Sequence, residues 1–115
     1  MNYSIESKGR NTTILRLEGR ITVYQLQKLR DVFAEAKDRS GDRKRLILDL
    51  EALIYIDPLA LGIIVAFSRD FREKGGEIRI VRMSDDIKFS FDLSRLSKVY
   101  EIYNRVEEAE KSFLV

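Results

Sequence analysis

The chain has 115 residues, a formal net charge of +2, 44% hydrophobic and 35% charged residues, and neither cysteine nor histidine. These values predict one folded domain spanning residues 1–115, exclude a disordered chain, and give no reason to expect a nucleic-acid partner. The missing residue types exclude thiol nucleophiles, imidazole catalysis and the usual zinc sites. The longest apolar run is too short to cross a membrane and the N-terminus lacks a signal-peptide pattern, so we expect a cytoplasmic protein with no membrane partner.

The N-terminal part predicts a β-hairpin followed by a helix. Residues 2–7 and 12–18 alternate between apolar and polar side chains, and Gly19 is expected to end the second strand. Thr22 and Gln25 have the spacing of a capping box at a helix start. The helix is expected to reach about Asp38, with one buried stripe made of Leu26, Leu29, Phe33 and Ala36.

The central part predicts a parallel strand–helix–strand unit. Residues 46–48 form an apolar run that ends in an acid, as is typical of a strand buried on both faces. Asp57 is a suitable N-cap and Pro58 a suitable first helical residue, so a helix is expected to begin there and to stop at the Gly75–Gly76 pair. Its apolar surface is wide enough to press against a sheet, and residues 77–82 alternate as the next strand.

The C-terminal part predicts two more helices around a short strand. Ser84 caps a helix that ends near Arg95, with its inward side chains at Ile87, Phe91 and Leu93. Residues 99–103 form the strand, and residues 106–114 form a last helix that buries Val106, Ala109 and Phe113. The resulting order, β-β-α-β-α-β-α-β-α, predicts an α/β fold.

The segment Tyr55-Ile56-Asp57-Pro58-Leu59-Ala60-Leu61-Gly62 resembles the STAS domain family of bacterial anti-sigma factor antagonists, which has a hydrophobic pair and then Asp-Ser-Ser/Ala-Gly-Leu-Gly. Residues 19–22, 46–50, 75–76 and 96–103 are similar to further family motifs, so the resemblance covers nearly the whole chain. It implies a STAS-like fold: a mixed central sheet of about five strands with about four helices.

The resemblance also implies a function. Members of this family bind an anti-sigma factor or a related kinase-fold protein, and a serine at the start of the second helix is phosphorylated by a partner kinase. Here Pro58 and Leu59 stand at the two positions that could carry that serine, Ala60 replaces a glycine, and Thr22 replaces an acid. We therefore expect a regulator of sigma-dependent transcription without this phosphorylation switch; phosphorylation at Thr22 or Ser84 stays open.

We expect the partner to contact the turn before the second helix and the turn before the first. The predicted contact residues are Ile21, Thr22, Tyr24, Ile56, Asp57, Pro58, Leu59 and Leu61. The alternative function is a non-switchable scaffold or a self-associating domain of a larger signalling or transport assembly, and a homodimer is compatible with either function.

Simpler roles compete at several of these positions. Capping a helix would by itself account for Asp57, Thr22 and Ser84. Asp49, Glu51 and Asp57 could converge at the carboxyl ends of parallel strands, where acids hold magnesium or transfer protons. No nucleophile or glycine-rich phosphate loop accompanies these acids, so we expect no enzyme, no cofactor and no metal.

Overall fold

The computed structural model of the protein describes residues 1–114. Within them a mixed sheet has the order β1-β2-β3-β5-β6, and a further strand, β4, pairs with β2. The strands are β1 (Asn2–Lys8), β2 (Thr12–Ile21), β3 (Arg45–Asp49), β4 (Leu53–Ile56), β5 (Glu77–Val81) and β6 (Ile102–Tyr103). The helices are α1 (Leu26–Ser40), α2 (Pro58–Glu73), α3 (Asp85–Leu93) and α4 (Val106–Ser112), with short 3-10 helices η1 (Val23–Gln25) and η2 (Leu96–Lys98).

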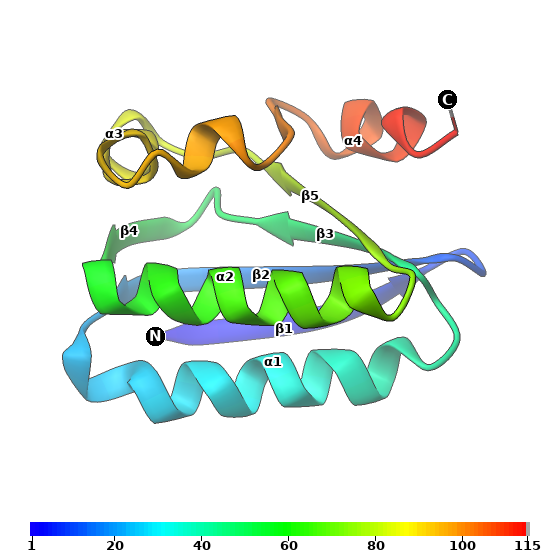
Figure 1. The fold of residues 1–115 in the computed structure, drawn as a ribbon, viewed down its shortest axis with the longest axis horizontal. Helices are drawn as coiled ribbons and strands as arrows, with labels where there is room; N and C mark the ends of the chain where they lie inside the picture. Colours follow the sequence, from blue (N-terminus) through cyan, green and yellow to red (C-terminus); the bar gives the residue numbers. More distant parts are fainter. Residues whose placement is uncertain (115) are drawn as a thin grey trace.

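Strand β2 organises the sheet. It is antiparallel to β1 and parallel to β3 and β4, which follow each other along it: β3 pairs with residues 12–16 of β2, and β4 pairs with residues 19–21. Figure 1 shows β3 and β4 running in the same direction, with the turn between them. All the parallel strands therefore end on one side of the molecule, where α2 begins.

The two faces of the sheet are covered by different helices. Helices α1 and α2 lie side by side on one face (Figure 1), over a core that includes Leu15, Leu17, Leu46, Leu48, Ile78 and Ile80. Helix α4 covers part of the opposite face, where Val106, Ala109 and Phe113 pack on Ile14, Ile47 and Val81. Neighbouring residues of one strand, such as Ile14 and Leu15 in β2, thus point to opposite faces of the sheet, and both are buried. A sheet covered on both faces by helices requires this alternation. No helix within residues 1–114 is long and apolar enough to cross a membrane.

The structure confirms the predicted helix starts and corrects three details of the sequence analysis. First, β4 was not predicted, so the sheet has six strands in place of about five. Second, β2 does not end at Gly19 but continues to Ile21, because Gly19 adopts a φ of +84° at a β-bulge. Third, Leu93 is 70% exposed and does not face the core, because it lies two residues from the buried Phe91 and so on the other side of α3.

The last strand is also shorter than predicted. Residues 96–98 form η2, Val99 is exposed, and β6 begins only at Ile102. Tyr100 precedes the strand and turns its ring into the core against Phe91. The predicted helical face of Val106, Ala109 and Phe113 is confirmed.

Candidate functional site

Two helix starts meet where β2 and β4 end. The backbone N–H of Asp57 donates a hydrogen bond to the carbonyl of Ile21 at 2.8 Å, which fixes the start of α2 beside the end of β2. Thr22 follows directly and caps η1: the backbone N–H of Tyr24 donates to the Thr22 hydroxyl, and the backbone N–H of Thr22 donates to the Gln25 side chain. The predicted capping box is therefore present, although the first turn that it opens is a 3-10 helix.

Asp57 is the N-cap of α2, as predicted. Its carboxylate accepts a hydrogen bond from the backbone N–H of Leu59 at 2.8 Å, and Pro58 occupies the first helical turn. Pro lacks the backbone N–H that would need a partner there, and its fixed φ suits a helix start. The geometry gives Asp57 a structural role independent of any partner.

The predicted contact residues fall into two groups. The first group is buried in the core beneath the two turns and consists of Ile21, Ile56 and Leu61. The remaining predicted residues lie outside the core: Tyr24 is 91% exposed and Leu59 is 62% exposed, while Pro58 is exposed and both Asp57 and Thr22 are partly exposed. Together with the exposed Val23 they form what we call the turn surface: Thr22, Val23, Tyr24, Asp57, Pro58 and Leu59.

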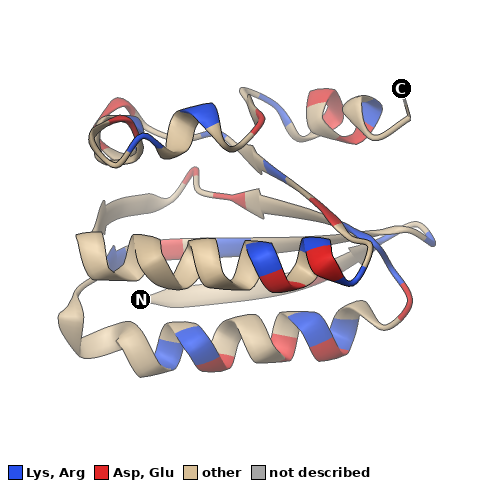
Figure 2. Cartoon of the chain, viewed as in Figure 1, with Lys and Arg blue, Asp and Glu red and all other residues tan. Residues whose placement is uncertain are grey.

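The turn surface is apolar and nearly free of charge. In Figure 2, η1, β4 and the first half of α2 are coloured as uncharged residues, whereas the second half of α2 has residues of both signs. In the sequence, the first charged residue of α2 is Arg69. Large apolar side chains that stay exposed in one region are typical of protein interaction sites.

Sequence reasoning missed a second group of exposed apolar side chains at this end of the molecule. On β4, Ile54 and Tyr55 are both exposed, and the guanidinium of Arg20 lies over the Tyr55 ring at 4.8 Å. On α3, Phe89 and Leu93 are exposed and stand one turn apart. The bulge between β2 and β4 disturbs the alternation of buried and exposed residues, so residues 53–56 show no period that would predict a strand.

The three acids that could form an active site, Asp49, Glu51 and Asp57, each bind another group of the protein. Asp49 is 2% exposed, and both Arg82 and Arg16 pair with its carboxylate. Glu51 pairs with Arg82, while Asp57 caps α2. The carboxylate of Asp49 raises the pKa of Arg82 by its hydrogen bonds. Among residues 1–114, no group of three or more acids is placed to hold a metal ion.

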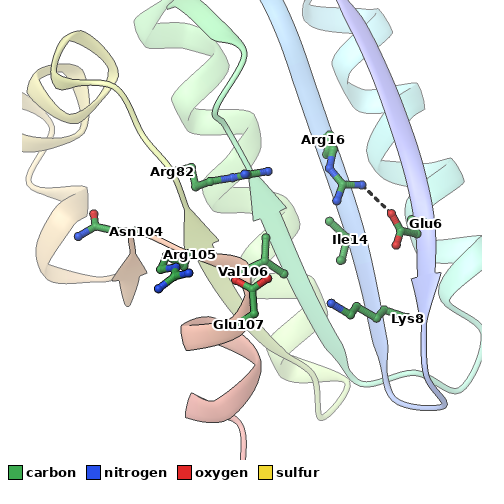
Figure 3. A pocket seen from close by; sticks show the side chains of 9 residues that line it. All are labelled: Glu6, Lys8, Ile14, Arg16, Arg82, Asn104, Arg105, Val106 and Glu107. Atoms are coloured by element: carbon green, nitrogen blue, oxygen red, sulfur yellow. Dashed lines mark hydrogen bonds and ion pairs between the residues drawn. The ribbon is translucent and has the colours of Figure 1, made fainter.

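A polar hollow of about 450 Å³ lies on the sheet face next to α4. Figure 3 shows Arg82 reaching over the strands toward Arg16, and Arg16 turned toward Glu6, with which it pairs; Lys8, Arg105 and Glu107 stand around the rim. Cations and carboxylates both line this hollow. Glu6 pairs with Arg16 inside it, whereas Lys8 and Arg82 pair with carboxylates outside its lining, those of Glu110, Asp49 and Glu51. The ion pairs tie β1, β2 and β3 to the segment after β5, which is a structural role.

Comparison with known proteins decides the family. The model of the STAS domain matches residues 3–109. The chain belongs to the STAS domain family. The resemblance and the α/β fold with a mixed sheet are thereby confirmed.

Curated relatives of this STAS chain are anti-sigma factor antagonists. The anti-sigma-B factor antagonist of Listeria monocytogenes is 29% identical over 106 residues, which cover 90% of this chain and 91% of that protein. The anti-sigma F factor antagonist of Paenibacillus polymyxa is 29% identical over 105 residues, covering 90% and 89%. The solved structure of the anti-sigma factor antagonist SpoIIAA in its unphosphorylated form has the same fold, with a TM-score of 0.81 over 97% of this chain and 96% of that one at 20% identity.

Proposed function

We propose that this STAS chain is an anti-sigma factor antagonist-like regulator that binds an anti-sigma factor or a related kinase-fold protein and so controls sigma-dependent transcription. One observation carries the proposal: Leu59 and Tyr24 are exposed on two capped helix starts joined by the hydrogen bond from Asp57 to Ile21. The caps and this hydrogen bond already order the backbone of both turns, so a partner that covers them orders mainly side chains. The names of the relatives support the same class of partner. The proposed role is binding, with no catalytic step.

We further propose that the interaction is not switched by phosphorylation at the start of α2. A phosphate there would add about −1.5 to −2 charges to a turn that a partner covers, while the helix N-terminus itself would tolerate it. Pro58 and Leu59 have no hydroxyl to receive a phosphate. The exposed Leu59 side chain in the first turn makes the surface apolar at all times.

The test is a binding and phosphorylation assay with each purified anti-sigma factor and kinase-like protein of the host. The natural chain is compared with the Pro58→Ser and Leu59→Ser variants. We expect one of these proteins to bind the natural chain without transferring phosphate to it, and Leu59→Ser to bind about tenfold more weakly. If none of them binds the natural chain, the proposed function is wrong.

A second candidate function, a self-associating domain within a larger signalling or transport assembly, is favoured by the apolar residues outside the turn surface. Ile54 is 65%, Phe89 62% and Leu93 70% exposed. Light scattering over a range of chain concentrations separates the two functions. A stable homo-oligomer that Leu93→Asp dissociates would support self-association, and a monomer at all concentrations would exclude it.

A further inference from the structure

A groove runs between α1 and α2 on the side away from the sheet. It encloses about 560 Å³. Its floor is formed by Phe33, Ile63 and Phe67, and the rings of Phe33 and Phe67 stack with their centroids 4.4 Å apart at 14°. Its walls include three small residues, Ala34, Gly62 and Ala66, which leave room for another backbone to come close.

Gly62 has no local reason to be glycine in this chain. It lies inside α2, its φ is not in the left-handed region, and a Cβ added there would meet nothing within 4 Å. Glycine inside a helix costs about 0.5–1 kcal/mol relative to alanine. Open space next to an unexplained glycine is expected where a second molecule approaches the helix closely.

The groove continues the turn surface. Leu59, 62% exposed, belongs to both. A partner that covers Leu59 is thus positioned to extend along α2 toward Ile63 and Phe67.

The charges on the rim favour an acidic occupant. Arg30 and Lys37 line the groove from α1, and the one carboxylate that lines it, Asp70, is held by Lys37 at 3.0 Å and by Lys74 at 3.3 Å. The hydrogen bonds from these lysines lower the pKa of Asp70, so it stays ionised and bound to them. Arg30 and Lys37 face a single carboxylate in the lining, so the groove has an excess of one positive charge, which is complementary to a negatively charged segment.

We propose that this groove receives an amphipathic helix of the partner protein, with its apolar side chains on Phe33, Ile63 and Phe67 and its acidic side chains beside Arg30 and Lys37. This inference rests on the proposed function and specifies the chemistry of the partner segment. Helices that lie in apolar grooves use anchors spaced three and four residues apart, which a groove formed by two helices accommodates.

The test uses the full chain and whichever purified anti-sigma factor of the host binds it. Ala34→Glu and Ala66→Glu place bulk and a negative charge in the groove, and Arg30→Glu reverses a rim charge; all three residues are exposed, so folding should be retained. The matched control is Ala52→Glu, an exposed alanine outside the groove. We expect each groove variant to weaken binding by about tenfold and the control to bind like the natural chain. Thermal unfolding of every variant verifies that it is folded.

The possible outcomes separate the two proposals. If Leu59→Ser weakens binding and the three groove variants do not, the turn surface binds the partner and the groove inference is wrong. If neither kind of variant changes binding, the partner contacts another surface; the groove inference and the assignment of the turn surface are then wrong, while the proposed function stands. If no host anti-sigma factor binds the natural chain, the groove inference falls with the proposed function. A homodimer that Ala66→Glu dissociates, with partner binding unchanged, would also overturn the inference by showing that a second copy fills the groove.

Discussion

The carboxylate of Asp57 accepts a hydrogen bond from the backbone N–H of Leu59, and this contact is made within the chain before any partner arrives. The residue at the start of the family motif thus has a physical reason to be there even though no serine follows it. Mutations of Asp57 can separate its contribution to the stability of the fold from any contribution to partner binding.

Asp57→Ala should lower the free energy of unfolding by about 1 kcal/mol, because an N-cap acceptor is lost. Asp57→Asn should remain close to the natural chain, since asparagine caps a helix about equally well. Urea denaturation measures both. If Asp57→Asn keeps its stability and loses partner binding, the carboxylate contacts the partner; an Asp57→Ala chain as stable as the natural one would contradict the capping role.

Asp49→Ala should destabilise the protein by about 2 kcal/mol, because it leaves Arg16 and Arg82 without the buried carboxylate that both bind. Glu51→Ala is the matched control: Glu51 pairs with the same Arg82, but it is 60% exposed, and such pairs contribute less than about 1 kcal/mol. Urea denaturation of the two variants compares their losses of unfolding free energy. Equal losses would mean that burial of the Asp49 carboxylate does not strengthen its ion pairs.

Tyr100 should ionise at a higher pH than a free tyrosine. Burial raises the pKa of its hydroxyl, which donates a hydrogen bond to the Ser68 hydroxyl at 2.8 Å. Because the folded pKa lies above the unfolded value of about 10, the stabilisation from the neutral phenol is complete below that pH and is lost as the pH rises through the folded pKa.

Tyrosinate absorbance during an alkaline titration measures this shift. Tyr100→Phe serves as the control, since it should remove one late-ionising group from the titration curve. If the variant loses a group that titrates like free tyrosine, the prediction is wrong.

Gly62→Ala should raise the free energy of unfolding by about 0.5–1 kcal/mol, because the added methyl group meets open space and the helix interior gains a better helix former. Gly75→Ala, at a φ of +88°, should instead lower it by about 1 kcal/mol. Thermal unfolding of the two variants is the comparison. A destabilised Gly62→Ala chain would show that something within the protein already needs the glycine.

The sequence was sufficient for those parts of the fold that have a local cause. Thr22, Asp57 and Ser84 cap helices where their side chains predicted it, and residues 46–48 and 77–82 show the alternation or apolar run of buried strands. The failures have a non-local cause. Strand β4 exists because Leu53–Ile56 pairs with the end of β2 across a bulge. A segment of four residues is too short for its hydrophobic pattern to predict a pairing with a distant strand.

The candidate site was predicted only in part for the same reason. The motif placed Asp57, Pro58 and Leu59 correctly at a helix start, but it could not tell that Ile21, Ile56 and Leu61 are buried beneath them. The groove depends on the distance between α1 and α2, which neither helix specifies alone. Its small residues, Ala34 and Ala66, are unremarkable in the sequence and become informative only when the two helices are placed side by side.

Strand β4 is joined to the sheet through only three residues of β2, whereas the longer β2–β3–β5 ladders lie elsewhere. Short ladders of this kind open locally at a lower free energy than the whole domain. Leu53 and Ile56 of β4 belong to the core, so only the exposed positions beside them, Ile54 in β4 and Leu59 in the first turn of α2, can change at little expense to the central strands. Substitutions at these exposed positions should therefore change what this end of the molecule contacts and leave the β2–β3–β5 ladders intact.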